Sequence, residues 1–582
     1  MPLWAAALLP LAFWPAFEDA FKLPQAVVAS LLAAWAIAGA APDLFRMRGA
    51  ASGALAPVAG VVALLVCSAV TGPFSRTADV VWGLALAGSA VLLPAIWRAG
   101  PPPVPAVMAA AGVASAAYSL VQYFLGDLAG DLQTRGLRPF STMGNPDFLA
   151  AYLVAVLPWL VSAALRRGGV IRWGAAATVL AALLLAQSRG AWLGMAAAGG
   201  AGLLVLRMAG GSLRPSRRAR AALGLAAVAI VLFVGVHRQG RERLGTMFAT
   251  GHFDAAGRFL MWRVAAGMIR ERPLAGGGPG SFAALYPEGH ARAMAADPTL
   301  PWFYSENAHS DALQVAAELG LLGLGLVAWA CTAFVRLAWR ARVRGDPSGL
   351  PLLLGFTGLA VDGLFNFPWY LLPTQGWFWL SYAWLAARHA GRGVAPAPLP
   401  RSGRLRLAAA GLAALAAGWF WSGDLRANGW LKRAGDLAAG QQPREALECA
   451  RRSWSDWRSW EGRDRVAAAA AVAAYGAGDL PTSEGWARAA IKVTPSLPAP
   501  WSQLGLSLAR QGRLAEAEAA CRAALALNPR QAEAWQTLGN IRYLRHDRAG
   551  AAEAWKAALA ANPALEGARN SLEGLKRRPS GP

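Results

Sequence analysis

Long apolar segments recur along the first 422 residues, and this pattern constrains the fold more than any other feature. Each segment reaches the roughly 17–25 residues that a helix needs to cross a bilayer core. Only 15% of the 582 residues are charged, whereas soluble domains carry about a quarter. The sequence predicts an all-α fold, a polytopic membrane bundle of about 12–13 spans followed by a soluble α-solenoid. The predicted spans are 3–17, 24–40, 54–72, 79–97, 104–125, 148–165, 172–187, 190–207, 219–236, 311–335, 350–366, 374–388 and 405–422.

Charge predicts how these spans are oriented. If the N-terminus is cytoplasmic, the inner loops hold twenty basic residues and the short outer loops hold five, which is the bias that sets membrane orientation. The long loop 237–310 and the tail 423–582 then lie outside, in the periplasm of a cell with two membranes. The net charge is +23, and arginines cluster in short loops between the apolar segments, so we expect no nucleic-acid partner. The N-terminal apolar segment lacks a basic leader and a cleavage site, which favours a retained helix.

The tail contains an internal repeat. A 34-residue period aligns Trp501 with Trp535 and Gly505 with Gly539, and prolines recur on the same period at 495, 529 and 563. This pattern is typical of tetratricopeptide repeats, helix pairs that stack on one another and usually bind peptides or proteins. Two repeats are clear, and weaker signals precede them, one repeat ending at Pro495 and a helical pair near 430–455. We therefore predict a membrane domain over 1–422 and a repeat domain over 423–582, with a protein partner for the repeats.

Three ionisable residues near predicted span ends are candidates for a site on the outer face, because charges at such positions are costly and often functional. Arg189 lies in QSRG between two spans, Arg258 opens an amphipathic helix in the outer loop, and His309 precedes the span at 311. The alternative interpretations are an interfacial arginine, a solvated loop arginine and a structural histidine. Glu306 and Asp311 lie near His309, and either could orient the imidazole. Glycines at 276–278 and 280 predict a flexible turn or one that phosphate can approach.

This combination of side chains suits one kind of chemistry. The planar fork of arginine matches phosphate oxygens, and two arginines would stabilise a departing lipid diphosphate. A neutral histidine would take the proton from an attacking sugar hydroxyl, because its unperturbed pKa suits proton abstraction near neutrality. The four cysteines show no metal-ligand spacing, and we expect neither a metal nor another cofactor. The residues therefore predict a glycosyl transfer centre with a polyprenyl-diphosphate donor.

The chain resembles the O-antigen ligase and O-antigen polymerase superfamily of bacterial membrane glycosyltransferases over about residues 100–390. The ligase signature is a histidine, then Asn, Ser or Gln, nine residues, a glycine, two residues and a glycine. It is met by His309, Ser310, Gly320 and Gly323. The family's other segments are similar to RPFSTMGNPDFLAAYL (138–153), the arginines of QSRG and GRFLMW, and DGLFNFPWY (362–370).

That resemblance implies metal-independent, inverting transfer of a glycan from undecaprenyl diphosphate, in the bacterial inner membrane and on its periplasmic face. It implies that Arg189 and Arg258 hold the diphosphate while His309 activates the acceptor. The remaining predicted substrate-binding residues are Arg138, Asn145, Arg263 and Glu306.

Several functions stay open. The signature favours a ligase that uses lipid A–core as acceptor, over an O-antigen or exopolysaccharide polymerase or a protein O-oligosaccharyltransferase. A lipid-linked oligosaccharide flippase would carry charges through the interior of its spans, whereas these lie at the outer ends. An assembly scaffold would explain the repeats but would not need so many spans or an ordered set of arginines and histidine.

Overall fold

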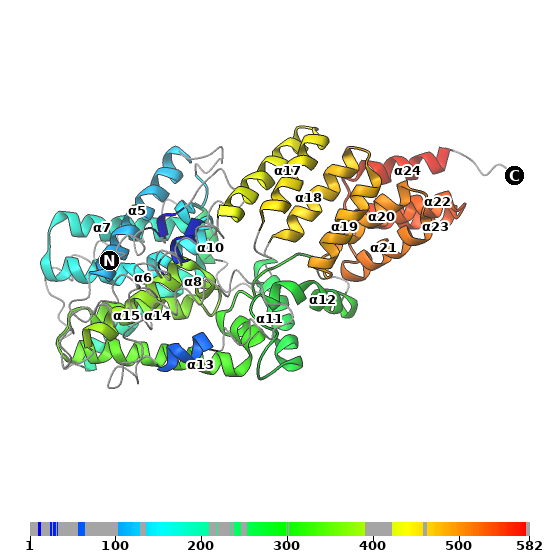
Figure 1. Cartoon of the computed structure of the whole chain (residues 1–582). Helices are drawn as coiled ribbons and strands as arrows, with labels where there is room; N and C mark the ends of the chain where they lie inside the picture. The colour runs from blue at the N-terminus through cyan, green and yellow to red at the C-terminus, as the bar shows by residue number, and fades with distance from the viewer. Residues whose placement is uncertain are drawn as a thin grey trace, which may run out of the picture.

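The structure is a computed structural model that describes residues 103–127, 136–208, 238–245, 253–297, 302–389, 422–457 and 462–577, with scattered positions before 64 and single residues at 217, 233 and 300. All regular structure in these residues is helical, as predicted. The apolar helices gather at one end of the molecule and the repeats at the other, with α11 and α12 between them (Figure 1). The predicted spans 3–17, 24–40, 54–72, 79–97, 219–236 and 405–422 lie wholly or largely outside the described residues.

The seven predicted spans that the structure does describe are all helices. Within the described residues, α5, α6, α8 and α13 are long and apolar enough to cross a membrane, and α7 and α14 are shorter apolar helices. The chain is therefore a multi-pass membrane protein. Two ends differ from the prediction, because α13 runs on to Val343 and α14 stops at Asp362. The helices are α5 (Val104–Leu125), α6 (Pro146–Arg167), α7 (Val170–Ala186), α8 (Arg189–Met208), α13 (Asp311–Val343), α14 (Gly349–Asp362) and α15 (Leu372–His389).

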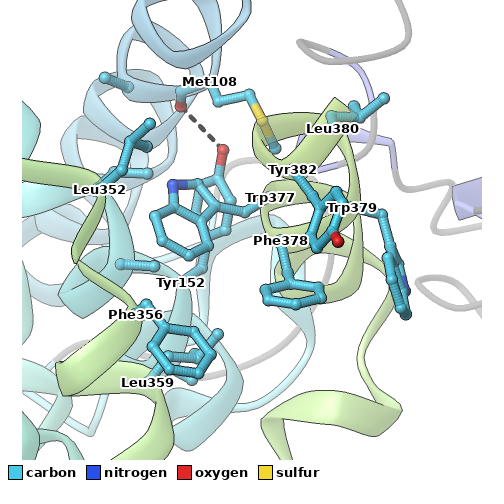
Figure 2. Close-up of a cluster of buried hydrophobic side chains, with 14 of the residues drawn as sticks. Met108, Tyr152, Leu352, Phe356, Leu359, Trp377, Phe378, Trp379, Leu380 and Tyr382 are labelled. Atoms are coloured by element: carbon cyan, nitrogen blue, oxygen red, sulfur yellow. Dashed lines mark hydrogen bonds between the residues drawn. The ribbon is translucent and has the colours of Figure 1, made fainter. Parts of the chain in front are cut away.

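Aromatic side chains from α15 fill the centre of this bundle (Figure 2). Trp377 and Phe378 are buried against residues of α6, α13 and α14. The Tyr152 hydroxyl, also buried, donates a hydrogen bond of 2.8 Å to the Met108 carbonyl, the dashed line in Figure 2. A buried phenol needs such a partner, since an unpaired polar group in an apolar core is costly. This bond fastens α6 to α5.

Small residues let three of these helices approach closely. A side chain on Gly194 of α8 would collide with the backbone of Gly358 in α14. A side chain on Gly358 would collide in turn with Val154 of α6. Glycine at such crossings allows the backbones to touch, which is a main source of packing energy between membrane helices. The contacts hold α8 and α6 against the C-terminal half of α14.

The outer loop and the repeats supply the other helices. The loop contains α10 (Arg238–Gly245), α11 (Phe253–Glu271) and α12 (Ser281–Ala296). The repeats contain a helix over 422–439 followed by α17 (Pro443–Asp456), α18 (Arg463–Gly476), α19 (Leu480–Val493), α20 (Pro498–Arg510), α21 (Leu514–Leu527), α22 (Ala532–Leu544), α23 (Arg548–Ala561) and α24 (Glu566–Arg577).

The 34-residue period is visible in the hydrogen bonds of the repeats. The indole N–H of Trp501 donates to the Pro495 carbonyl, and that of Trp535 donates to the Pro529 carbonyl, both at 2.8 Å. One bond is the copy of the other, 34 residues along the chain. The weaker sequence signals, the repeat ending at Pro495 and the pair near 430–455, are helix pairs as well.

We expect Gly194→Ala to destabilise the bundle. The added methyl group would push α8 away from α14, and overpacking of this kind costs about 1–3 kcal/mol. Thermal unfolding of the purified protein in detergent should show a lower midpoint. Gly199→Ala is the matched control, because Gly199 lies on the same helix and a side chain there would meet nothing within 4 Å among the described residues. Equal midpoints for the two variants would contradict the close packing.

Candidate functional site

The turn between α14 and α15, residues 362–370, is the point where the candidate residues meet. Asp362 is fully buried, and its Oδ1 accepts a hydrogen bond of 2.6 Å from Asn366 Nδ2. A side chain on Gly190 would collide with the Asp362 carboxylate and would lie 2.7 Å from Asn366 Nδ2. Only glycine fits there, so the start of α8, which begins with half-buried Arg189, lies directly against the turn.

Asp311 fastens the start of α13 to the same turn. Its backbone N–H donates to the Gly363 carbonyl at 2.8 Å, and its carboxylate accepts the N–H of Trp369 at 3.2 Å. His309 precedes it by two residues and packs edge-on against Phe367, with ring centroids 4.8 Å apart. Phe367 packs in the same way against Phe148 of α6, at 5.3 Å. The turn therefore connects His309 with Phe148, which belongs to the segment 138–153 that resembles the family.

Arg258 lies on α11, the outer-loop helix that packs beside the His309 loop. It is half-buried, and α11 shares a buried apolar core with Ala308, the neighbour of His309. Arg263 lies five residues further along the same helix and is exposed. Five residues correspond to a rotation of about 140° around the axis, so the two arginines leave the helix on different sides. Arg258 is on the half-buried side, near the His309 loop, and Arg263 is on the exposed side.

Arg138 and Asn145 brace the start of α6. Arg138 donates from Nη2 to Asp147 at 2.7 Å and from Nε to the Ala186 carbonyl at 2.8 Å. Asn145 caps α6, since its side-chain oxygen accepts the N–H of Asp147 at 2.8 Å. Arg138 thus connects α6 to the end of α7, where the chain turns towards Arg189. Both residues support the predicted site from beside it.

The loop before α13 is held by a buried amide. Gln314 is 2% exposed; its Oε1 accepts the N–H of Ala308 at 2.8 Å, and its Nε2 donates to Asn307 Oδ1 at 3.0 Å. His309, which follows Ala308, has a φ of 49°, a left-handed conformation that is uncommon outside glycine. Gln187, just before Ser188 and Arg189, has a φ of 52°. Such backbone needs surrounding structure to hold it and clusters at functional sites. Glu306, three residues before His309, is exposed.

The glycine-rich turn after α11 packs on a break in α13. Gly320 interrupts α13 with a φ of 69°. Across the break, the N–H groups of Gly277 and Gly278 donate to the Ala317 and Glu318 carbonyls at 3.0 and 2.8 Å, and Leu321 N–H donates to Pro273 at 2.8 Å. These two glycine amides are used by α13, which argues against a phosphate-binding role for them. The signature glycine at 320 instead joins the outer loop to the membrane helix.

An apolar cavity of about 350 Å³ lies beside Asp311, which forms part of its wall. It lies between α13, α14 and α15, and its walls are mostly apolar, including Val315, Val327 and Phe356. Its polar part is made by Asp311, Glu318, Tyr370 and Gln375. The Tyr370 hydroxyl donates to Glu318 Oε2 at 3.0 Å. The cavity could accommodate part of an apolar chain beside the turn.

Three buried polar atoms line the place where α7, α8 and the turn meet. They are Gln187 Nε2, Ser188 Oγ and Asp362 Oδ2, and none has a hydrogen-bond partner among the described residues. All three side chains are at most 1% exposed. Because buried polar atoms are nearly always paired, these atoms can provide two donors and an acceptor to a polar ligand.

The sequence analysis gave no individual role to Asp362, Phe367 or Gln314. Asp362 and Phe367 lie in DGLFNFPWY, a segment that resembles the family, and an acidic residue at the end of an apolar segment is costly and often functional. Gln314 carried no signal, since an amide one turn into a helix is common. The contacts of Phe367 and Gln314 with the His309 loop exist only in the folded chain.

We expect Gly320→Ala to release the glycine-rich turn. A left-handed backbone costs a residue with a side chain about 1–3 kcal/mol, and the methyl group would also collide with the backbone of Leu274. Limited proteolysis should then cut within 270–280 several-fold faster than in the wild-type protein. Gly325→Ala on the same helix, where a side chain would meet nothing within 4 Å among the described residues, should cut at the wild-type rate. Equal protection in both variants would contradict the docking of the turn.

Comparison with known proteins supports the family resemblance. The family model for O-antigen ligase matches residues 174–328, and a tetratricopeptide-repeat model matches 498–531. We found no match among curated proteins. Three similar solved structures have low identity and low TM-scores. YrrB, described as a TPR protein with an unusual peptide-binding site, is 16% identical over 29% of this chain and 83% of that one, with a TM-score of 0.23. MamA is 16% identical over 29% of this chain and 97% of that one (TM-score 0.22), and the first TPR domain of human RPAP3 is 19% identical over 20% of this chain and 91% of that one (TM-score 0.19). The chain thus carries an O-antigen ligase family region within its membrane part and tetratricopeptide repeats after it, as the resemblance implied.

Proposed function

We propose that this protein transfers a glycan from undecaprenyl diphosphate to an acceptor at the outer face of the inner membrane, in the manner of an O-antigen ligase. The observation that carries the proposal is the convergence of the α8 start and the His309 loop on one turn, with Arg258 on the helix that packs beside that loop. An O-antigen ligase family match over 174–328 supports the same class of reaction.

The proposed step is a single displacement. The acceptor hydroxyl attacks the anomeric carbon of the donor sugar while the bond from that carbon to the diphosphate oxygen breaks, which inverts the configuration. His309 takes the hydroxyl proton as general base. Undecaprenyl diphosphate leaves with the bonding electron pair, and Arg189 and Arg258 stabilise its charge. The step uses groups of this chain and needs no metal.

The surroundings fit a donor that is half lipid and half sugar. The apolar cavity beside Asp311 suits part of an isoprenoid chain, because it lies at the depth of the membrane helices. The buried atoms of Gln187, Ser188 and Asp362 suit the oxygens and hydroxyls of a polar headgroup. Asp311, already bonded to the turn, would keep the His309 loop between the lipid and water sides.

This proposal includes an orientation and a division of the chain. The turn, the outer loop and the repeats would face the periplasm, with the N-terminus in the cytoplasm. Residues 1–422 would form the transferase domain and 423–582 the repeat domain. The preferred acceptor is lipid A–core, because the histidine signature is of the ligase type.

We expect His309→Ala and Arg258→Ala to abolish most transfer without loss of folded protein. Loss of a general base costs about 10²–10⁴-fold in rate, and loss of one charge-stabilising group costs about 10²–10³-fold. The measurement is transfer by reconstituted protein that is given undecaprenyl-diphosphate glycan, with and without lipid A–core. Arg263→Ala is the control, because this arginine lies exposed on the same helix as Arg258.

Each outcome of that assay has a meaning. Product that depends on lipid A–core identifies a ligase. A ladder of longer lipid-linked glycan without core identifies a polymerase, and glycan attached to an added protein acceptor identifies a protein oligosaccharyltransferase. Normal transfer by His309→Ala would refute its role as base.

Gln314→Ala should slow the reaction although Gln314 is not placed to touch substrate. It removes the bonds that hold Ala308 and Asn307, and a displacement of about 1 Å at a reacting group can cost 10²-fold. We expect kcat to fall by about 10- to 100-fold while the KM for the donor stays near the wild-type value, since the arginines are untouched. A change confined to KM would show that Gln314 does not position the base.

A further inference from the structure

The repeats are attached to the outer loop by hydrogen bonds at one edge. Ser496, in the connection between α19 and α20, donates from its hydroxyl to the Ala284 carbonyl of α12. Trp302, after α12, donates from its indole N–H to the Leu527 carbonyl at the end of α21, at 3.3 Å. Figure 1 shows α12 lying beside α21, and the two helices are in contact. Residues more than 200 positions apart are thus in direct contact.

Beneath Trp302 lies a buried aromatic layer. The Trp302 indole stacks on His290, with ring centroids 5.9 Å apart and an angle of 10° between the ring planes. His290 is fully buried, and its Nδ1 is 3.0 Å from the Phe303 carbonyl. Tyr286 packs on both His290 and Phe303, and burial raises the pKa of its hydroxyl. The layer is rigid because each ring is in contact with the next.

The same layer reaches the candidate site. A side chain on Gly257 would lie 3.4 Å from the ring of Phe303, and the next residue along α11 is Arg258. The core shared by α11 and α12 also includes Ala308, the neighbour of His309. A continuous series of contacts through Trp302, His290 and Phe303 therefore joins the edge of the repeats to Gly257, the neighbour of Arg258.

We propose that the repeats act as an internal positioning element for the donor site. By holding α12 and Trp302, they fix the hairpin of α11 and α12 and with it the position of Arg258 relative to His309. The surface formed by α12 and Trp302 is an interaction surface whose partner is this chain's own repeat region. A protein that binds the repeats and shifts this edge would change how tightly the donor is held. This inference rests on the proposed function.

The first arm of the test measures donor binding to the full-length protein. Trp302→Phe with Ser496→Ala removes both donors and keeps the stacking on His290. Ser496→Arg inserts a bulky side chain into the contact. We expect the Kd for undecaprenyl diphosphate to rise about three- to tenfold, as loss of one or two neutral hydrogen bonds predicts, with kcat at saturating donor within about twofold of wild type.

The controls separate position from stability. Trp535→Phe removes a similar indole-to-carbonyl bond inside the repeats, and Ser455→Arg adds the same side chain at an exposed position of α17. Both should leave the Kd unchanged. A fall in kcat and in folded protein without a change in Kd would overturn the proposal.

The second arm measures the contact itself. A short bis-maleimide should join cysteines introduced at 284 and 496, and neither single-cysteine variant should show this product. Trp302→Phe should lower the yield. Lost crosslinking with an unchanged Kd, or no crosslinking in the otherwise wild-type chain, would overturn the positioning role. If the double-cysteine protein crosslinks but the wild-type protein binds no undecaprenyl diphosphate, the proposed function and the positioning role that rests on it both fail, while the docking of the repeats stands.

Discussion

The double attachment of Asp311 to the turn 362–370 is the interaction on which the rest of the site depends. One residue supplies both a backbone donor to Gly363 and a carboxylate acceptor for Trp369. It is buried at the start of α13, the longest apolar helix among the described residues, so the bonds form in a medium where their loss would be costly. They fix the start of α13 against the end of α14, and every candidate group is placed relative to that junction.

Two kinds of packing connect this junction to the rest of the structure. Inside the membrane part, glycines at 190, 194 and 358 bring α8 and α6 against α14, so Arg189 starts its helix at the turn. Outside it, the break at Gly320 lets α13 bond to the glycine-rich turn, which carries α11 and α12. The repeats then contact the outermost of these elements through Trp302 and Ser496. Contacts therefore run from the membrane helices through the outer loop to the repeats, and the proposed positioning role would act along them.

How much of this could be predicted differs from residue to residue. The seven described spans and the helix pairs of the repeats follow from apolar run length and a 34-residue period, because both depend on local sequence. Arg258 and His309 were predictable as types of side chain suited to the chemistry. Arg263 carried the same signal as Arg258, and only the helix rotation separates the half-buried residue from the exposed one. Arg138 and Asn145 make bonds at the start of α6 that the sequence did not indicate, and their role in substrate binding stays a prediction.

The sequence by itself determined that the chain is helical, crosses a membrane and ends in stacked repeats, since burying apolar surface in lipid or between neighbouring helices requires only local patterning. It also determined which side chains can stabilise a diphosphate and accept a proton. The tertiary structure decided which of them meet. Asp362, Phe367 and Gln314 became part of the site, and the repeats came to lie on α12, through contacts between residues far apart in the chain. Such contacts depend on helix rotation, helix breaks and close glycine packing, which no local pattern encodes.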